Sequence, residues 1–381
     1  MATRTIGIII NGATGRIAST QHLQNGLAAI RREGGLPIGD DRIMPRPLLV
    51  GRDAERLAAI AKAHEIEHWS TDLDGALSDP DYAIFFDAAA THMRLPLLQK
   101  AIAAGKHIYT EKPVAPSVEE GLALVRAAEA RGVKHGAVED KTYLPGFQKL
   151  AYLMDTGFFG RIVGFRLEFG WWVFDGMHTP AQRPSWNYQK AGGGGLVSDM
   201  YPHWRYMIEG ILGRIRGIVS ASWTATPERV DERGMRYQVD VEDSAATIVE
   251  LENGAFGTIL SSWATRVRRD DLLLLQVDGT HGSALATLHK CHVQSLAETP
   301  KIAAFNINTD INADYRAPWG AVPDLAPVRN GYRMGWEGFL RHVVADAPFR
   351  SDLRAGVRDV QLAEACQRSM AERRWVAMDL L

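Results

Sequence analysis

Two side chains that could move a proton stand four residues apart in the second half of the chain. Asp199 and His203 follow a run of four glycines at residues 192–195, and their spacing places both on one face of an expected helix. A carboxylate beside an imidazole raises its basicity and fixes its orientation, which a general base requires. We expect Asp199 also to cap the helix and Pro202 to lie in its first turn. The structural alternative is an Asp that only caps and a His that only packs.

A glycine-containing turn near the N-terminus could bind a pyrophosphate. It follows the apolar run of residues 6–10 and has the spacing GxxGxxA in place of the full GxGxxG fingerprint. Small residues permit a tight turn, and the amides at the start of the next helix can hold phosphate oxygens. A plain strand-to-helix turn is the alternative, but the position between the first strand and the first helix favours dinucleotide binding. The expected contacts are Gly12, Ala13, Thr14, Gly15, Arg16 and Ile17.

The ends of two later strands carry further candidate cofactor contacts. An expected loop at residues 36–46 precedes a strand at 47–50, which runs into Arg52 and Asp53. Asp53 suits the ribose hydroxyls of NAD and Arg52 the extra phosphate of NADP, so either cofactor is open. Ala88 and Ala89 end the buried strand of residues 82–89 and are expected beside the same cofactor.

Lys112 follows a third strand, at residues 107–110, and lies between Glu111 and Pro113. A lysine in a loop is usually a solvated surface residue. This one directly follows a buried strand and is flanked by a carboxylate and a proline, which is unusual for surface sequence. Ligands bind doubly wound parallel sheets at the carboxyl ends of the strands, so we expect Glu111 and Lys112 to lie at the cofactor.

The elements that must position these residues divide into two parts. Strands alternate with helices over about 140 residues, which predicts a doubly wound parallel sheet that binds ligands at the carboxyl ends of its strands. After Pro145 the strands follow one another, and Asn253-Gly254 predicts a type I′ hairpin between two of them. The expected fold class is α/β, with a Rossmann domain at 1–145 and an α+β domain at 146–381. That second domain carries an open-faced, mostly antiparallel sheet and a closing helix at 354–373.

An aromatic-rich loop follows the first strand of the second part. Its three tryptophans, at positions 171, 172 and 186, could fill a sheet face, or they could stack on the apolar faces of a sugar ring. Interleaved His178 and Arg183 favour a binding loop, and Arg183 could pair with an anionic substrate group. The candidate substrate contacts in this loop are Trp172, His178, Arg183 and Trp186.

Composition excludes several classes of partner. The 381 residues carry 43 basic and 45 acidic side chains, for a net charge of -2, so nothing indicates nucleic acid or a membrane surface. No apolar run approaches the length of a membrane span, and no signal peptide is evident. Two cysteines make neither a disulfide framework nor a metal cluster, and we expect no metal. The expected location is the cytoplasm.

Together these motifs resemble the Gfo/Idh/MocA family of nicotinamide-dependent oxidoreductases. The resemblance covers nearly the whole chain and depends on the order of the nucleotide turn, the tripeptide at 111–113, and the glycine run before Asp199 and His203. It implies a Rossmann domain followed by an open-faced sheet domain, which commonly forms a dimer or tetramer through that sheet. It also implies a catalytic centre made of Lys112, Asp199 and His203, with NAD or NADP as cofactor.

Two motifs depart from the family pattern. The nucleotide turn lacks the full fingerprint, which leaves the cofactor preference open. The family's Arg-aromatic-x-Pro segment is replaced here by Thr142-Tyr143-Leu144-Pro145, preceded by Lys141. Lys141 and Tyr143 are therefore further candidates for contact with the substrate.

We expect hydride transfer between a secondary hydroxyl of a sugar, cyclitol or sugar derivative and the nicotinamide. His203 takes the hydroxyl proton, Asp199 orients His203, and Lys112 donates a hydrogen bond to the same oxygen. One alternative is an NAD-dependent glycosidase on an acidic or sulfonated glycoside, which oxidises C3 transiently and needs Lys141 or Tyr143 as a second base. Another is a nucleotide-binding sensor without catalysis, which the joint presence of the three catalytic residues disfavours.

Overall fold

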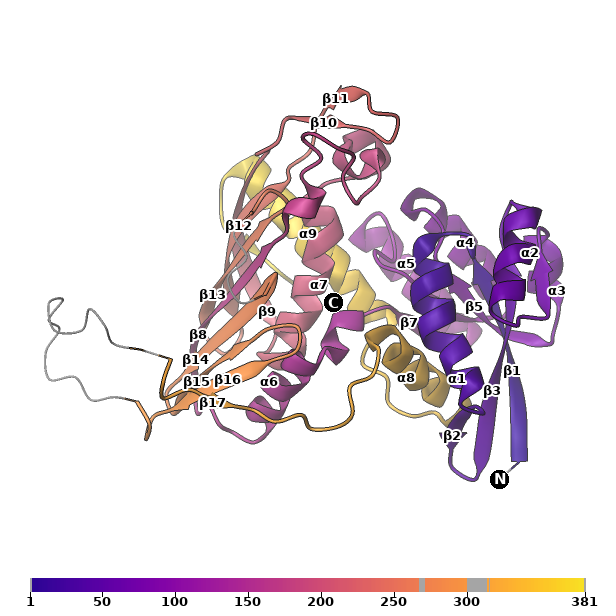
Figure 1. Cartoon of the computed structure of the whole chain (residues 1–381), viewed down its shortest axis with the longest axis horizontal. Helices are drawn as coiled ribbons and strands as arrows, with labels where there is room; N and C mark the ends of the chain where they lie inside the picture. The colour runs from indigo at the N-terminus through magenta and orange to yellow at the C-terminus, as the bar shows by residue number, and fades with distance from the viewer. Residues whose placement is uncertain (1, 267–270, 300–313, 315, 380–381) are drawn as a thin grey trace, which may run out of the picture.

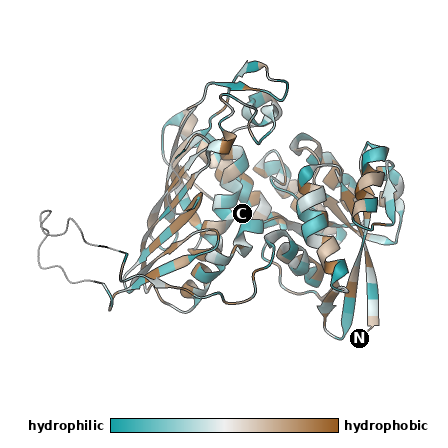
Figure 2. Ribbon diagram, viewed as in Figure 1, coloured by the Kyte–Doolittle hydropathy of each residue, from teal (hydrophilic) through white to brown (hydrophobic). Residues whose placement is uncertain are grey.

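Two sheets, each with its own helices, lie on opposite sides of the molecule, and one long helix runs between them (Figure 1). The computed structural model describes residues 2–266, 271–299, 314 and 316–379. Hydrophobic residues gather along the strands and the inward faces of the helices, while the outward faces are largely hydrophilic (Figure 2). Within the described ranges, no helix is both long and apolar enough to cross a membrane.

Six parallel strands form the first sheet, in the order β4, β3, β1, β5, β6 and β7. This order reverses direction between β1 and β5, as in doubly wound nucleotide-binding sheets, and confirms the expected parallel sheet. The strands are β1 (Ala2–Asn11), β3 (Asp41–Val50), β4 (His68–Ser70), β5 (Tyr82–Asp87), β6 (His107–Thr110) and β7 (His135–Ala137).

Helices cover both faces of this sheet because successive strand residues point to opposite sides. Ile8 and Ile10 of β1 pack beneath one helical layer, and Ile9 packs beneath the other. The first layer comprises the π-helical η1 (Ile17–Leu27), its continuation α1 (Ala28–Arg32) and α2 (Ala54–Ala63). The second comprises α3 (Leu73–Ser78), α4 (Thr91–Ala103) and α5 (Val118–Arg131).

The prediction of a loop at residues 36–46 is wrong for this segment of the chain. It forms a hairpin in which β2 (Leu36–Ile38) pairs antiparallel with the start of β3. The strand β3 also begins six residues before the expected strand at 47–50, and it contains Pro45 and Pro47. Along residues 44–47 the outer side of β3 has no paired strand, because β2 ends at residue 43 of β3 and β4 begins at residue 48. A proline is tolerated on such an unpaired edge, since no partner needs its missing N–H.

Among the described residues the second sheet has nine strands and is mostly antiparallel, as expected; of these strand pairs only β13–β8 is parallel. Helices α6 (Pro145–Asp155) and α7 (Leu196–Ile211) cover one face, and their apolar residues share a single core with the strands. In sheet order the strands are β17 (Gly320–Ala321), β16 (Cys291–Ser295), β15 (Gly282–Ala286), β14 (Leu273–Gly279), β8 (Ile162–Gly170), β13 (Phe256–Ser262), β12 (Ser244–Leu251), β9 (Ile215–Trp223) and β18 (Val376–Ala377). A separate hairpin joins β10 (Glu228–Val230) to β11 (Arg236–Gln238).

The hairpin between β12 and β13 forms where Asn253-Gly254 predicts it, but the predicted turn type is wrong. A type I′ turn needs positive φ at both central residues. Gly254 has φ 82, whereas Asn253 is not among the residues with positive φ. The amide of Gly254 bonds the Leu251 carbonyl, and the Asn253 side chain accepts the N–H of Ala255. The side-chain bond therefore stabilises a turn that places only the glycine in the left-handed region.

Two helices near the C-terminus connect the halves. The long α9 (Leu353–Glu372) packs its first half with the parallel sheet through Val357 and its second half with the other core through Cys366. The shorter α8 (Gly331–Ala345) contributes Trp336 to the core of the first half. The boundary expected at residue 145 stays a prediction, but α8, which the sequence placed in the second domain, packs with the first.

Candidate active site

The nucleotide turn lies where the chain leaves β1 and has the shape that a pyrophosphate needs. Gly12 has φ 74, and a Cβ at this position would lie 2.9 Å from the backbone of Ala88 and Ala89 at the end of β5. Arg16 at the start of η1 makes no capping hydrogen bond through its side chain, and a helix start without such a cap can hold phosphate oxygens with its first amides. The residues present therefore fit a dinucleotide at this position.

The loop after β3 carries the two candidate cofactor contacts Arg52 and Asp53, and Asp53 also makes a hydrogen bond within this segment. Asp53 caps α2, and its Oδ1 accepts the N–H of Arg56 at 3.0 Å. Arg52 is exposed and has no ion pair or hydrogen bond through its side chain among the described residues. Its guanidinium is thus available to an added phosphate, while one oxygen of Asp53 remains available to ribose.

Glu111 is held by a chain of hydrogen bonds from two residues distant in sequence, His22 and Trp336. Its Oε1 lies 2.7 Å from Nε2 of His22 on η1, and Nδ1 of His22 accepts the indole N–H of Trp336 at 3.1 Å. Burial alone would raise the pKa of Glu111, but the hydrogen bond from His22 and the charge of Lys112 hold it below its usual value. The other oxygen, Oε2, accepts the backbone N–H of Lys112 at 3.3 Å. An ionised, immobile Glu111 therefore orders the next residue.

Lys112 leaves the parallel sheet and reaches α7 on the other half of the molecule. Its Nζ donates to Oδ1 and to the backbone carbonyl of Asp199, both at 2.9 Å. Arg183 is a second cation beside Asp199, with its Nη2 2.7 Å from Oδ2. This contact is an ion pair, because its angles do not meet those of a hydrogen bond. Burial would raise the pKa of Asp199, but the charges of Arg183 and Lys112 outweigh it and lower that pKa. Asp199 is thus a buried anion between two cations.

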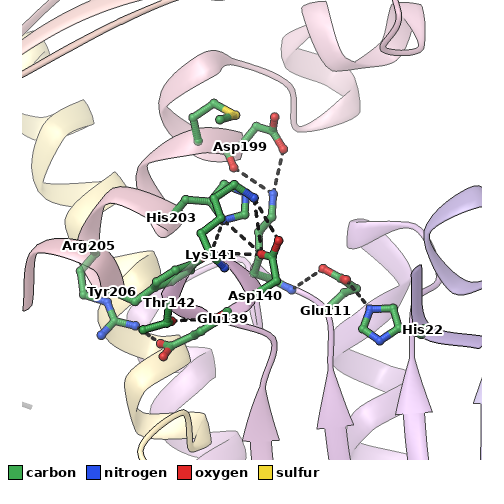
Figure 3. A network of polar contacts seen from close by, with 12 residues as sticks. His22, Glu111, Glu139, Asp140, Lys141, Thr142, Asp199, His203, Arg205 and Tyr206 are labelled. Carbon is green, nitrogen blue, oxygen red and sulfur yellow. Dashed lines mark hydrogen bonds and ion pairs between the residues drawn. The ribbon is translucent and has the colours of Figure 1, made fainter. Parts of the chain in front are cut away.

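His203 lies one helical turn beyond Asp199 and is bound by different residues (Figure 3). Its Nδ1 lies 2.7 Å from the hydroxyl of Tyr206, and that hydroxyl lies 3.2 Å from Oδ1 of Asp140. Asp140 belongs to the short helix η2 (Asp140–Tyr143), which directly follows the parallel sheet. Burial lowers the pKa of His203 well below its ordinary value, and the charges of Lys141, Lys112 and Arg183 lower it further. His203 is therefore neutral and able to accept a proton.

The expected pairing of Asp199 with His203 is therefore wrong, and so is the expected cap. The helix begins at Leu196, and the carboxylate of Glu242 accepts the N–H of Val197 at 2.9 Å. Because a distant carboxylate caps the helix, the Asp199 side chain is free to face Lys112. Pro202 lies in the second turn, inside the helix, where its missing N–H removes a bond to the carbonyl four residues earlier.

The other expected substrate contacts fall into two groups. Lys141 joins the site, with its Nζ 3.2 Å from Oδ2 of Asp140, and Trp172 and Trp186 are exposed at 37% and 45%. His178 is also exposed. Tyr143 turns away, because its ring packs against the glycines of α8, and a Cβ at Gly335 would lie 3.8 Å from its Cε2. Contact of Tyr143 with the substrate stays a prediction.

Four residues of this network have no motif that marks them. Asp140 and Tyr206 bind His203, and His22 and Trp336 bind Glu111. Asp140 gave one usable signal, since it follows a strand of a parallel sheet at the end where ligands bind. Tyr206 lies one turn beyond His203 on the same helix face, which spacing could have indicated. Nothing in sequence connects Trp336 to His22.

Comparisons with known proteins agree over both halves. The GFO/IDH/MocA oxidoreductase family model with an NAD-binding Rossmann fold matches residues 6–138, and the GFO/IDH/MocA C-terminal domain model matches residues 147–285. A D-xylose dehydrogenase of Paenarthrobacter nicotinovorans is 45% identical over 379 residues, which cover 98% of this chain and 97% of that protein.

Two further comparisons concern levoglucosan dehydrogenases. The enzyme of Pseudarthrobacter phenanthrenivorans is 27% identical over 62% of this chain and 64% of that protein. A solved levoglucosan dehydrogenase in complex with NADH and levoglucosan superposes with a TM-score of 0.81 at 21% identity, over 99% of this chain and 100% of that chain. At this identity the likeness is one of fold.

Proposed function

This chain belongs to the Gfo/Idh/MocA family of oxidoreductases with an NAD-binding Rossmann fold, and from that premise we propose that it oxidises a ring hydroxyl of an aldopyranose such as D-xylose. One observation carries the proposal: Lys112 of the parallel sheet meets Asp199 of α7, one turn from the neutral His203. Donor, anion and base thus converge where the two halves meet.

The chain's own residues divide the work of alcohol oxidation. A bound nicotinamide dinucleotide supplies the acceptor for the hydride that leaves the carbon. His203 takes the hydroxyl proton at Nε2, which has no hydrogen-bond partner among the described residues. Lys112 has three N–H donors; two bind Asp199, and the third is left for the substrate oxygen. Asp199 holds Lys112 in this position.

The choice of a sugar follows from the relatives and from the aromatic loop. The relative that is 45% identical over nearly the full length is named for D-xylose. Trp172 and Trp186 present exposed rings on which the apolar face of a pyranose can stack. The anomeric hydroxyl of an aldopyranose is a hemiacetal hydroxyl whose carbon also carries one hydrogen, so loss of that hydride and of the hydroxyl proton gives a lactone.

The glycosidase alternative is less well supported. In that alternative Arg183 could bind an acidic group of the substrate, but Arg183 already pairs with Asp199. Its candidate second bases are Lys141 and Tyr143, and the ring of Tyr143 packs against α8, which leaves Lys141. Net oxidation of a free sugar therefore fits the site better.

We also propose a homo-oligomer formed through the open face of the second sheet, as a dimer or tetramer. The face opposite α7 exposes large apolar side chains on neighbouring strands: Val163, Ile248, Phe256 and Leu260. Such a patch favours protein contact. Cys291 and Cys366 are buried and unpaired, which suits a cytoplasmic location.

The test is incubation of the purified protein with NAD or NADP and a panel of free aldoses, levoglucosan and chromogenic glycosides. Reduced cofactor should accumulate with D-xylose or a close aldopyranose, and the panel identifies the preferred coenzyme. Release of aglycone that requires cofactor, without accumulation of its reduced form, would overturn the proposal in favour of hydrolysis.

A further inference from the structure

We propose that Tyr206 and Asp140 are positioning residues that lock His203 in a single tautomer, with its proton on Nδ1 and its lone pair on Nε2. The inference rests on the proposed function, in which His203 is the general base. It assigns the carboxylate that acts on His203 to Asp140 of η2 instead of Asp199, which lies four residues away on the same helix.

Counting donors and acceptors around the Tyr206 hydroxyl fixes the tautomer. This oxygen has three neighbours: Nδ1 of His203 at 2.7 Å, Oδ1 of Asp140 at 3.2 Å and the backbone N–H of Lys141 at 3.3 Å. A phenol has one proton to donate and two lone pairs. Since a carboxylate only accepts, the phenol proton belongs to Asp140. The two lone pairs then accept from Lys141 N–H and from Nδ1–H of His203.

The opposite tautomer leaves this network unsatisfied. If Nδ1 were unprotonated, the Tyr206 hydroxyl would donate its proton to Nδ1. The Tyr206 oxygen and Oδ1 of Asp140 would then face each other as two acceptors with no proton between them. Both aromatic side chains are nearly enclosed, with His203 5% and Tyr206 1% exposed, so water cannot readily repair the mismatch. Burial raises the pKa of Tyr206 well above its ordinary value, and the charge of Asp140 raises it further, so the phenol keeps its proton.

The same contacts act on the charge that forms when His203 accepts a proton. Lys141, Lys112 and Arg183 face this ring from η2, from the end of β6 and from the aromatic loop, and each opposes a positive imidazolium. Asp140 lies 3.9 Å from Nδ1 and is the compensating anion on this side. Asp199 is already neutralised by two cations.

The chain offers a matched control for the test. Tyr201 is on the same helix, is fully buried and also uses its hydroxyl, which lies 2.8 Å from Oγ1 of Thr247 in the sheet core. Tyr206→Phe and Tyr201→Phe therefore remove the same atom from the same helix, but only the first touches His203. Asp140→Asn tests the second member of the pair.

The primary readout is the nitrogen chemical shifts of the histidine rings in protein labelled at histidine with ¹⁵N, with His203 assigned by the signal that His203→Asn removes. In the wild type we expect the His203 ring to have a protonated Nδ1 and an unprotonated Nε2. We expect mixed tautomers of this ring in Tyr206→Phe and the wild-type tautomer in Tyr201→Phe. We also expect Tyr206→Phe to lower kcat by about 10²-fold with little change in KM.

Two results would overturn the proposal: an Nε2–H tautomer in the wild type, or a Tyr206→Phe variant with an unchanged tautomer and kcat. These outcomes are separable from the proposed function. If no sugar reduces the cofactor while the shifts behave as expected, the tautomer lock stands and the substrate assignment fails. If sugar is oxidised and the shifts contradict us, the lock fails and the function stands.

Discussion

Trp336 donates its indole N–H to Nδ1 of His22 at 3.1 Å, across 314 residues of sequence. An indole nitrogen only donates, so Nδ1 is unprotonated, and the proton of a neutral His22 lies on Nε2, facing Glu111 at 2.7 Å. The second oxygen of Glu111 accepts the N–H of Lys112. A helix near the C-terminus thus orders the lysine of the active site.

Trp336→Phe should therefore destabilise the protein and weaken cofactor binding together. The change leaves Nδ1 of a fully buried His22 without its donor, which costs about 1–3 kcal/mol before any cavity forms. Trp204→Phe is a matched control, since Trp204 is also fully buried but its Nε1 has no hydrogen-bond partner in the described structure. Urea denaturation and cofactor titration measure both effects. Equal losses in the two variants would contradict the role of the indole donor.

Asp199 should act through Lys112 and not through His203. Lys112→Met and Asp199→Asn each disrupt the same ion pair, so the double variant should lose about as much kcat/KM as the worse single variant. Asp199→Asn combined with His203→Asn serves as the comparison, in which losses should be closer to additive. Strong coupling of Asp199 to His203 with none to Lys112 would restore the pairing expected from sequence.

The acid limb of kcat/KM should report His203 and respond to Lys141. Burial and three nearby cations lower the pKa of His203, so the base stays neutral and active until the pH falls well below 6.5. Lys141→Met removes one cation and should move the limb to higher pH. A shift to lower pH, or no shift, would show that another group controls the limb. Arg216→Met, at an exposed ion pair on the second sheet, is the neutral control.

Arg205 should be one of the most costly charged residues to replace for stability. It is buried and donates to Glu139 after β7 (Figure 3). It also donates to Asp359 of α9, at 2.5 Å. Removing one partner of a buried ion pair costs about 3–5 kcal/mol. Arg205→Met should therefore lower the free energy of unfolding by that amount, measured in urea. A loss below about 1 kcal/mol, the size expected for an exposed pair, would contradict this estimate of its role.

The sequence located most elements, because strand and helix periodicities are local properties. The family resemblance, and not the local pattern, placed Lys112, Asp199 and His203 in one centre; the structure shows the contact between Lys112 and Asp199, with His203 one helical turn further along α7. The local pattern assigned the wrong partner to Asp199, because spacing along one helix does not reveal contacts from distant segments. Lys112 binds the Asp199 carboxylate, and Glu242 caps the helix in its place.

The remaining errors have the same origin. Asp140 is hydrogen-bonded to the hydroxyl of Tyr206, which in turn contacts His203, and this arrangement depends on how η2 packs against α7. The edge position that allows Pro45 and Pro47 in β3 depends on where β2 and β4 end. Each of these contacts is set by tertiary packing, which the local pattern does not contain.

The most direct test of the account is the turnover of His203→Ala beside the wild type, with D-xylose and related aldopyranoses and the preferred cofactor. We predict that the wild type reduces the cofactor and that the variant loses about 10²- to 10⁴-fold in kcat, the contribution of a positioned general base. Cofactor binding, followed by fluorescence, should be unchanged. A variant that binds cofactor and keeps near wild-type turnover would contradict the assignment of His203 as the base.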